Sequence, residues 1–295
     1  DNYVRSGTGK TYFDYIEDFK PYIGNVKNSS ELTRQMSKDI PPVTLDVQLM
    51  LIPNLDSSLY ESALAKLVSK ISSAEGSIQE EPYYLSDNTP VIRAIIPSTS
   101  LIRYENDPAI YRIEETDFFS VESSSVGTVD LSTLTLDDSV SIDDLPVVVV
   151  LDSGVSFPNG LSSVICQHWL PTDSSGGNAE HGTKVASRVA FRYLEQQLPT
   201  TTLTPRARII DCNILDGSVP VNIFIKRIQL AVESFSEVAQ IYNLSANAKT
   251  SIEGDEMSIV GYELDVLQFR KGVQFVVSAG NHDLWHVEQS LYDIL

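Results

Sequence analysis

The sequence is poor in cysteine, and this scarcity limits what can hold the fold together. Two cysteines, Cys166 and Cys212, occur in 295 residues. They cannot form the multi-disulfide framework of small secreted domains, and neither lies in a CxxC or Cys/His arrangement with zinc-binding spacing. We therefore expect both to be small buried hydrophobic residues. A core of ordinary apolar side chains is available instead, because 42% of the residues are hydrophobic.

Positive charge is also scarce. The chain has 21 Lys and Arg residues against 40 Asp and Glu residues, which gives a formal net charge of −19. The phosphate backbone of nucleic acids and anionic membrane surfaces repel such an acidic protein, so we expect neither as a partner. No long apolar run predicts a membrane span or the core of a signal peptide. We expect a cytoplasmic location, although the sequence begins with Asp1 rather than Met and further residues can precede it.

Residues 1–41 are predicted to be a polar, partly helical extension. The segment Ser6–Thr11 reads Ser-Gly-Thr-Gly-Lys-Thr and matches the end of a phosphate-binding P-loop. Val4 stands where the first glycine of that motif belongs, and no buried strand precedes it, so we do not assign phosphate binding. A solvated helix is expected next, with Ser29 or Ser30 as its cap and Glu31 in its first turn.

Residues 42–116 show strand and helix patterns in the order βαββαβ. Apolar residues alternate with mostly polar ones in the first strand and recur at helical spacing in the first helix. The expected strands are 43–51, 77–84, 91–96 and 109–115, and the expected helices are 57–74 and 98–106. This order predicts an α+β, ferredoxin-like domain. A freestanding interaction domain is one hypothesis for its role.

Residues 117–145 are predicted to be an acidic linker rich in Ser and Thr. Nine acidic residues and no Lys or Arg occur between Glu114 and Asp144. Such a segment buries too little apolar area to offset the entropy of ordering the chain. We expect a solvated tether; the alternative is a segment that is processed by the protein itself or mimics a substrate.

Residues 146–295 alternate between strands and helices. Val147–Leu151 begins with four consecutive valines, a pattern typical of a strand that is covered on both faces. Further strands are expected at 207–214, 238–245 and 273–278, and helices from Gly182, at 220–235 and at 258–271. The alternation predicts an α/β domain with a parallel sheet and crossover helices.

Three short motifs follow predicted strands or begin a predicted helix. Asp152 follows the valine run and enters a Ser-Gly turn, His181 begins His-Gly-Thr, and Asn281 ends Ala-Gly-Asn. The carboxyl ends of the strands are where open α/β sheets bind ligands. Each residue also has a purely structural interpretation: Asp152 as a helix cap, His181 as a hydrogen-bonded helix residue and Asn281 as a turn former. The other histidines, His168, His282 and His286, have no comparable context and are expected to be structural or solvated.

The three motifs in this order resemble the subtilisin-like serine peptidases, the subtilases, over roughly Pro146–Asp283. The resemblance implies a subtilisin-like fold and a serine endopeptidase that hydrolyses peptide bonds through an Asp/His/Ser triad. It implies that His181 is the general base, that Asp152 orients it, and that Asn281 donates a hydrogen bond to the oxyanion. It also suggests that the unit at 42–116 is a prodomain.

The nucleophile of this family is missing from the sequence. In subtilases it lies in Gly-Thr-Ser at a helix start after the oxyanion Asn, and no Gly-Thr-Ser occurs in these residues. Residues 146–295 are also short for a whole subtilase domain. We expect the serine C-terminal to Leu295 and expect the chain as given to be inactive. The alternatives are a serine supplied by a separate chain, and an inactive pseudopeptidase or scaffold that grips peptides without cleaving them.

The resemblance also implies how substrate and partners bind. The strand ending at Ser245 would pair with an extended polypeptide substrate, with Ser245, Ala246 and Asn247 as its binding residues. Asn247 stands where the family usually has Gly, so specificity does not carry over. Calcium is common in subtilases, but neither Glu253–Glu256 nor another loop has ligand spacing, and we expect no metal or other cofactor. Subtilases also occur beside an ATPase partner protein, which the acidic linker permits.

A second class of peptidase offers a rival interpretation of Asp152. Aspartic peptidases also use Asp-Ser-Gly, and they pair two such turns across one site. The tripeptide occurs once in this chain, so a homodimer would have to supply the second copy. That interpretation leaves the His181 helix and the Asn281 turn without a role.

Overall fold

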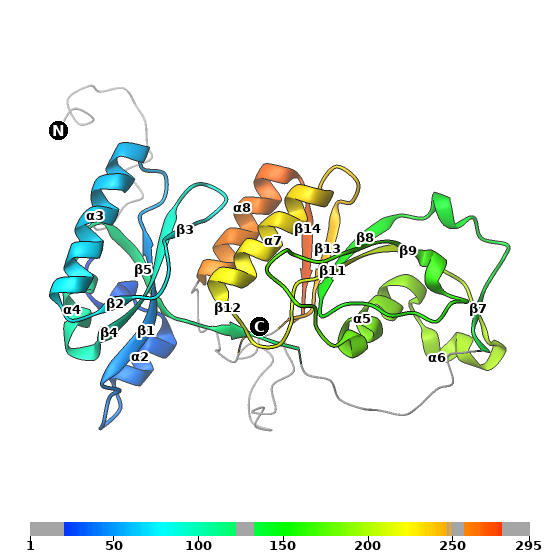
Figure 1. The fold of residues 1–295 in the computed structure, drawn as a ribbon, viewed down its shortest axis with the longest axis horizontal. Coiled ribbons are helices and arrows are strands. Elements are labelled where there is room, and N and C mark those ends of the chain that lie inside the picture. The colour runs from blue at the N-terminus through cyan, green and yellow to red at the C-terminus, as the bar shows by residue number, and fades with distance from the viewer. Residues whose placement is uncertain (1–20, 122–132, 247, 249–256, 279–295) are drawn as a thin grey trace, which may run out of the picture.

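The computed structural model describes residues 21–121, 133–246, 248 and 257–278. Two units lie side by side in Figure 1, an N-terminal one built on an antiparallel sheet and a second one built on a parallel sheet. The P-loop-like segment Ser6–Thr11 lies outside the described residues, as do Asn247, the acidic stretch Glu253–Glu256 and Asn281. None of the helices in the described ranges has the length and apolar character that a membrane crossing requires.

The N-terminal unit is a sheet in the order β2-β4-β1-β5, with every neighbouring pair antiparallel and β3 added to β4. Its strands are β1 (Thr44–Leu51), β2 (Ser77–Ile78), β3 (Tyr83–Tyr84), β4 (Pro90–Pro97) and β5 (Ile110–Glu115). Its helices are η2 (Asn25–Lys27), α2 (Ser30–Met36), α3 (Ser57–Ser73), η3 (Ser98–Ser100) and α4 (Leu101–Glu105). That this unit is a ferredoxin-like domain stays a prediction.

The helices of this unit form where the sequence provides apolar spacing and caps. Tyr60, Leu67 and Ile71 recur along α3 and pack in one core with the strands. Ser29 caps α2 by accepting a hydrogen bond from the Leu32 amide at 3.0 Å. The single strand expected at 77–84 is instead two short ones, because Pro82, which lacks an amide proton, interrupts the pairing with β4.

The linker is more ordered than its composition predicts. Within the described residues it contains β6 (Phe118–Phe119), β7 (Thr135–Leu136) and η5 (Ile142–Asp144). The expectation of a fully solvated tether is therefore wrong at both of its ends. The reason is the few apolar residues among the acids: Phe119 and Leu134 are 8% and 3% exposed and belong to the protein's cores.

The second unit confirms the predicted parallel sheet with crossover helices. Its strand order is β14-β13-β8-β11-β9, and all pairs are parallel. The strands are β8 (Val147–Asp152), β9 (Ile165–Trp169), β11 (Arg208–Asn213), β13 (Ile241–Leu244) and β14 (Gln274–Val277). The longer helices are α5 (Ala179–Phe191), α7 (Val221–Phe235) and α8 (Ile259–Lys271). The short elements are η6 (Ser162–Val164), α6 (Leu194–Gln197), η7 (Leu198–Thr200), β10 (Thr202–Leu203) and β12 (Val219–Pro220).

Strand β8 is covered on both faces, as its valines predict. Val149 and Leu151 share a core with residues of α7 and α8, whereas Val150 packs with α5 on the opposite face. Figure 1 shows α7 and α8 between the sheet and the N-terminal unit, and α5 on the far side. The chain adds β9 and β11 on one side of β8 and then β13 and β14 on the other. The carboxyl end of β8 is thus the topological switch point, where such sheets place their sites.

Strand β9 was not predicted, because its sequence shows neither apolar alternation nor an apolar run. It is the edge strand next to β11, and three of its five residues are exposed. This edge position also overturns one expectation: Cys166 is exposed on β9, whereas Cys212 is buried on β11 as predicted. A small thiol side chain is buried only where the sheet has a neighbouring layer on that face.

Candidate active site

Asp152 is the last residue of β8, and its side chain is fully buried. Its Oδ1 accepts a hydrogen bond from the backbone amide of Ser153 at 2.7 Å and one from the Ser153 hydroxyl at 3.2 Å. A buried carboxylate requires such donors, since an unpaired charge in the protein interior costs several kcal/mol. The turn after β8 therefore fixes the orientation of Asp152.

His181 is the third residue of α5 and faces Asp152. Its Nδ1 lies 2.9 Å from Asp152 Oδ1 and 3.0 Å from Oδ2, and its side chain is 16% exposed. Both distances lie within hydrogen-bond reach, about 2.6 to 3.2 Å. Asn178 caps the helix by accepting a hydrogen bond from the Glu180 amide at 3.0 Å. The helix begins three residues earlier than predicted because of this cap.

Gly182 lets the helix that carries His181 approach the turn after β8. A Cβ at this position would lie 2.2 Å from the carbonyl oxygen of Gly154 and 3.1 Å from Asp152 Oδ1. Any side chain at residue 182 would therefore push α5 away from Asp152. Thr183 completes the contact, because its hydroxyl accepts the Ser156 amide at 2.8 Å. The His-Gly-Thr motif thus has a packing reason that is independent of any chemistry.

The comparison with protein families agrees with this geometry. The model of the subtilase family matches residues 143–292, just over half of the chain. The chain belongs to the subtilase family. Subtilases are serine peptidases, so the second unit is a domain of a hydrolase family. No curated protein matches the sequence closely enough to be reported.

Two of the predicted substrate-binding residues of this subtilase are described. Ser245 and Ala246 follow β13, which pairs with β8 through Leu244 and Leu151. The Ser245 hydroxyl donates to Asn243 Oδ1 at 3.0 Å, and Ala246 is 7% exposed. These residues therefore lie beyond the carboxyl end of the strand next to the one that carries Asp152.

The structure leaves other predicted residues of the subtilase site untested. Asn247 and Asn281 lie outside the described residues, so their positions relative to His181 stay predictions. Among the residues that the structure does describe, no group of three or more Asp, Glu, His or Cys side chains could hold a metal ion.

A second pair of histidine and aspartate was missed by the sequence analysis. His168 Nδ1 on β9 lies 2.7 Å from Asp211 Oδ2 on β11. The same Asp211 oxygen accepts the backbone amide of Val155 at 3.0 Å. Burial raises the pKa of Asp211, and the hydrogen bond from His168 partly opposes that rise. The sequence signal was weak: a polar residue in the centre of an apolar strand, Ile-Ile-Asp-Cys, which predicts that the residue has a partner.

Proposed function

We propose that this subtilase contributes the base and the orienting carboxylate of a serine endopeptidase triad. The observation that carries the proposal is the contact between His181 Nδ1 and both oxygens of the buried Asp152. A carboxylate at Nδ1 favours the tautomer that keeps the Nε2 lone pair available as a proton acceptor. It also stabilises the imidazolium that forms when Nε2 takes a proton from a serine hydroxyl. Asn281 would donate its amide to the oxyanion of the tetrahedral intermediate.

The nucleophile in this proposal is a serine that lies outside residues 1–295. The sequence contains no Gly-Thr-Ser, and Ser245, which follows the strand beside β8, donates its hydroxyl to Asn243. A Gly-Thr-Ser segment C-terminal to Leu295 is our first choice, and a serine on a separate chain is the second. A pseudopeptidase, which would bind extended peptides without cleaving them, is the rival function.

The N-terminal unit is proposed to be a prodomain that supports the second unit. Two of its glutamates form hydrogen bonds with the first turns of α7 and α8. Both Glu114 carboxylate oxygens accept the Ile259 amide at the start of α8, at 3.2 and 3.1 Å. Glu80 Oε2 accepts the side-chain amide of Asn222, in the first turn of α7, at 2.5 Å. The first turns of α7 and α8, both fully described, contain no acidic residue of their own, so the carboxyl groups beside these two helix N-termini come from the N-terminal unit.

The same interface contains a buried carboxylate from the second unit. Glu263 on α8 is 1% exposed and accepts hydrogen bonds from the Ser86 amide, the Ser86 hydroxyl and the side chain of Gln229. Met50, Leu85 and Val91 of the N-terminal unit join the core formed by α7 and α8. Removal of the N-terminal unit would expose both this apolar surface and the carboxylate, so the second unit is expected to fold less readily without it.

The linker pairs with the second unit through a short added strand. Strand β6 adds to β12 in antiparallel register, with Phe119 opposite Val219. The Phe119 ring stacks on Phe224 of α7, with 4.1 Å between centroids and 5° between planes. Main-chain pairing with a side chain in an apolar pocket is the usual mode of strand addition. This contact is compatible with the hypothesis that the linker mimics a substrate, although it is made with β12 and not with β13, the strand proposed to bind the substrate.

A fluorophosphonate probe tests the proposed function, because it reacts covalently with an activated serine. Residues 1–295 should take up no label, whereas a polypeptide that continues through a Gly-Thr-Ser segment should be labelled. Labelling of residues 1–295 would show that a serine of this chain is the nucleophile, and our assignment would be wrong. An unlabelled longer polypeptide, even after residues 1–145 are removed by cleavage of the folded protein, would favour the pseudopeptidase.

A further inference from the structure

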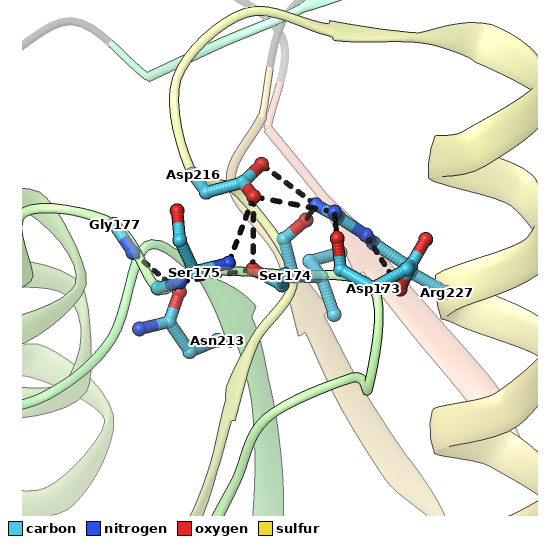
Figure 2. A network of polar contacts seen from close by, with 9 residues as sticks. Asp173, Ser174, Ser175, Gly177, Asn213, Asp216 and Arg227 are labelled. Carbon is cyan, nitrogen blue, oxygen red and sulfur yellow. Dashed lines mark hydrogen bonds and ion pairs between the residues drawn. The ribbon is translucent and has the colours of Figure 1, made fainter.

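A buried arginine on α7 joins two loops beside the Asp152–His181 pair. The Arg227 side chain is 4% exposed. Its Nη1 donates to Asp216 Oδ1 at 2.8 Å and to the Ile214 carbonyl at 2.7 Å, and its Nη2 donates to the Asp173 carbonyl at 3.1 Å and to Asp216 Oδ2 at 3.3 Å. Its Nε lies 3.4 Å from Asp173 Oδ1. Figure 2 shows the guanidinium between Asp216 and Asp173, which come from different loops.

Asp216 connects Arg227 to the loop that leads into α5. Its Oδ2 accepts the Ser174 hydroxyl at 3.1 Å and the Ser175 amide at 3.2 Å (Figure 2). The Ser174 hydroxyl in turn accepts the Gly176 amide at 3.1 Å. The hydrogen bonds from Arg227 are the largest cause that lowers the pKa of Asp216, to about 2. The carboxylate is therefore ionised at neutral pH and available to all of these donors.

The loop held by Asp216 packs against the turn that follows Asp152. A Cβ at Gly177 would lie 2.0 Å from the Leu215 carbonyl oxygen and 2.9 Å from the Ser153 side chain. The Gly177 amide donates to Asn213 Oδ1 at 3.1 Å. One residue further, the Asn178 carbonyl accepts the Ser153 hydroxyl at 2.7 Å. The loop thus fills the space between the 213–216 segment and Ser153, whose amide orients Asp152.

Stability alone is a poor explanation for this arginine. Withdrawing a guanidinium and its carboxylates from water carries a desolvation penalty of several kcal/mol per ion, and apolar residues of similar size are often as stabilising. A buried ion pair does, however, fix the relative position of the segments that it joins, because its hydrogen bonds are directional. Here the joined segments are the two loops that flank the Asp152 turn.

From these contacts we infer that Arg227 is a positioning residue for the Asp152–His181 pair. It acts through Asp216, which holds the 173–178 loop against Ser153. The last residue of this loop, Asn178, caps the helix that carries His181. The inference rests on the proposed function only where it predicts that loss of Arg227 lowers catalytic activity. The positioning itself can be measured on the chain without a nucleophile.

The test is the His181 Nδ1 proton, followed by NMR in residues 1–295 with isotope-labelled histidine. The chain has four histidines, and the signal is assigned by its loss in His181→Ala. Arg227→Met should remove the signal or make its exchange with solvent at least about tenfold faster. Arg227→Lys, which keeps the charge but loses the planar fork, should have an intermediate effect. The matched control is Lys226→Met, which removes the same charge from an exposed residue of the same helix and should leave the signal unchanged.

An unchanged His181 signal in folded Arg227→Met would overturn the inference. If that variant does not fold, Asp216→Asn decides: its side chain is 19% exposed, and it should accelerate exchange in the same direction, whereas an unchanged signal would again reject the inference. Neither result depends on fluorophosphonate labelling. A failure of the proposed function, which is absence of label in the longer polypeptide, is therefore distinguishable from a failure of the positioning role.

Discussion

The second unit contains two pairs of histidine and aspartate that share one contact but differ in their surroundings. His181 and Asp152 meet through Nδ1 at 2.9 Å, and His168 and Asp211 meet through Nδ1 at 2.7 Å. In the first pair the imidazole is 16% exposed and lies on a helix, whereas in the second it is 62% exposed and lies on an edge strand. Hydrogen-bond geometry alone therefore does not identify the functional pair.

The positions of the two carboxylates separate the pairs. Asp152 ends β8 at the topological switch point of the sheet, where a ligand can reach the histidine beside it. Asp211 lies inside β11, opposite Val150, and one of its oxygens is engaged by the Val155 amide. The second pair therefore secures the segment that follows Asp152, and the first pair is the one that we propose to act on a substrate. Each substitution described next is expected to affect the two pairs to different degrees.

The largest difference is expected from removing each imidazole. In a polypeptide that continues through a Gly-Thr-Ser segment, His181→Ala should lower turnover by about 10⁶, the magnitude measured for this change in a subtilisin. His168→Ala is the matched control and should stay within about tenfold, since no role in proton transfer is assigned to it. Rates of fluorophosphonate labelling and of peptide cleavage measure both. Equal losses in the two variants would abolish the distinction between the pairs.

A methyl group at Gly182 should damage the first pair and leave the second intact. The added Cβ would lie 2.2 Å from the Gly154 carbonyl, so α5 must move away from Asp152. A displacement of about 1 Å can reduce catalysis by about 10²-fold. Gly261→Ala, in α8, is the control, because its nearest neighbour would be a side-chain atom at 3.3 Å. Normal labelling of Gly182→Ala would show that the close approach of α5 is not required.

Asp211→Ala should affect stability more than activity. The substitution leaves the Val155 amide and His168 without their acceptor, which should lower the free energy of unfolding by about 1 to 3 kcal/mol. Urea denaturation of residues 1–295 measures the loss. Labelling of the longer polypeptide by fluorophosphonate should change by less than about tenfold. A loss of labelling as large as that of Asp152→Asn, about 10⁴, would mean that both carboxylates serve the reaction.

The features that the sequence could predict are those with a local signature. The valine run predicts a buried strand because no polar residue interrupts it. Asp152 and His181 were chosen as candidate site residues because each sits in a short motif at an element's end. The Asp152–His181 contact itself depends on Gly182 and on the Asn178 cap, which bring the helix to the turn. Local pattern was thus sufficient for naming the residues, and packing decides whether they meet.

What escaped prediction depends on contacts between distant residues. Strand β9 has no apolar pattern and forms by pairing with β11, so His168 was expected to be structural or solvated without a named partner. Arg227 lies 54 residues from Asp173 in the sequence, and nothing local marks it as buried. The acidic linker was expected to be a solvated tether, because composition does not show that Phe119 has a partner ring in Phe224. These features arise from tertiary structure, which overrides local propensity.

The smallest expected effect is a difference in pH dependence that isolates Asp211. Burial raises the pKa of its carboxyl in the folded protein above the ordinary value of 3.8, so the folded state binds this proton more tightly than the unfolded state. The stability that this proton contributes is complete below pH 3.8 and is lost as the pH rises through the raised pKa.

Asp211→Asn has no such proton and keeps an oxygen to accept the Val155 amide. Its free energy of unfolding should therefore fall less than that of the unmodified chain as the pH increases from 4 to 7. Urea denaturation across this range measures the difference. A steeper fall in Asp211→Asn would mean that the hydrogen bond from His168 outweighs burial in setting the pKa of Asp211.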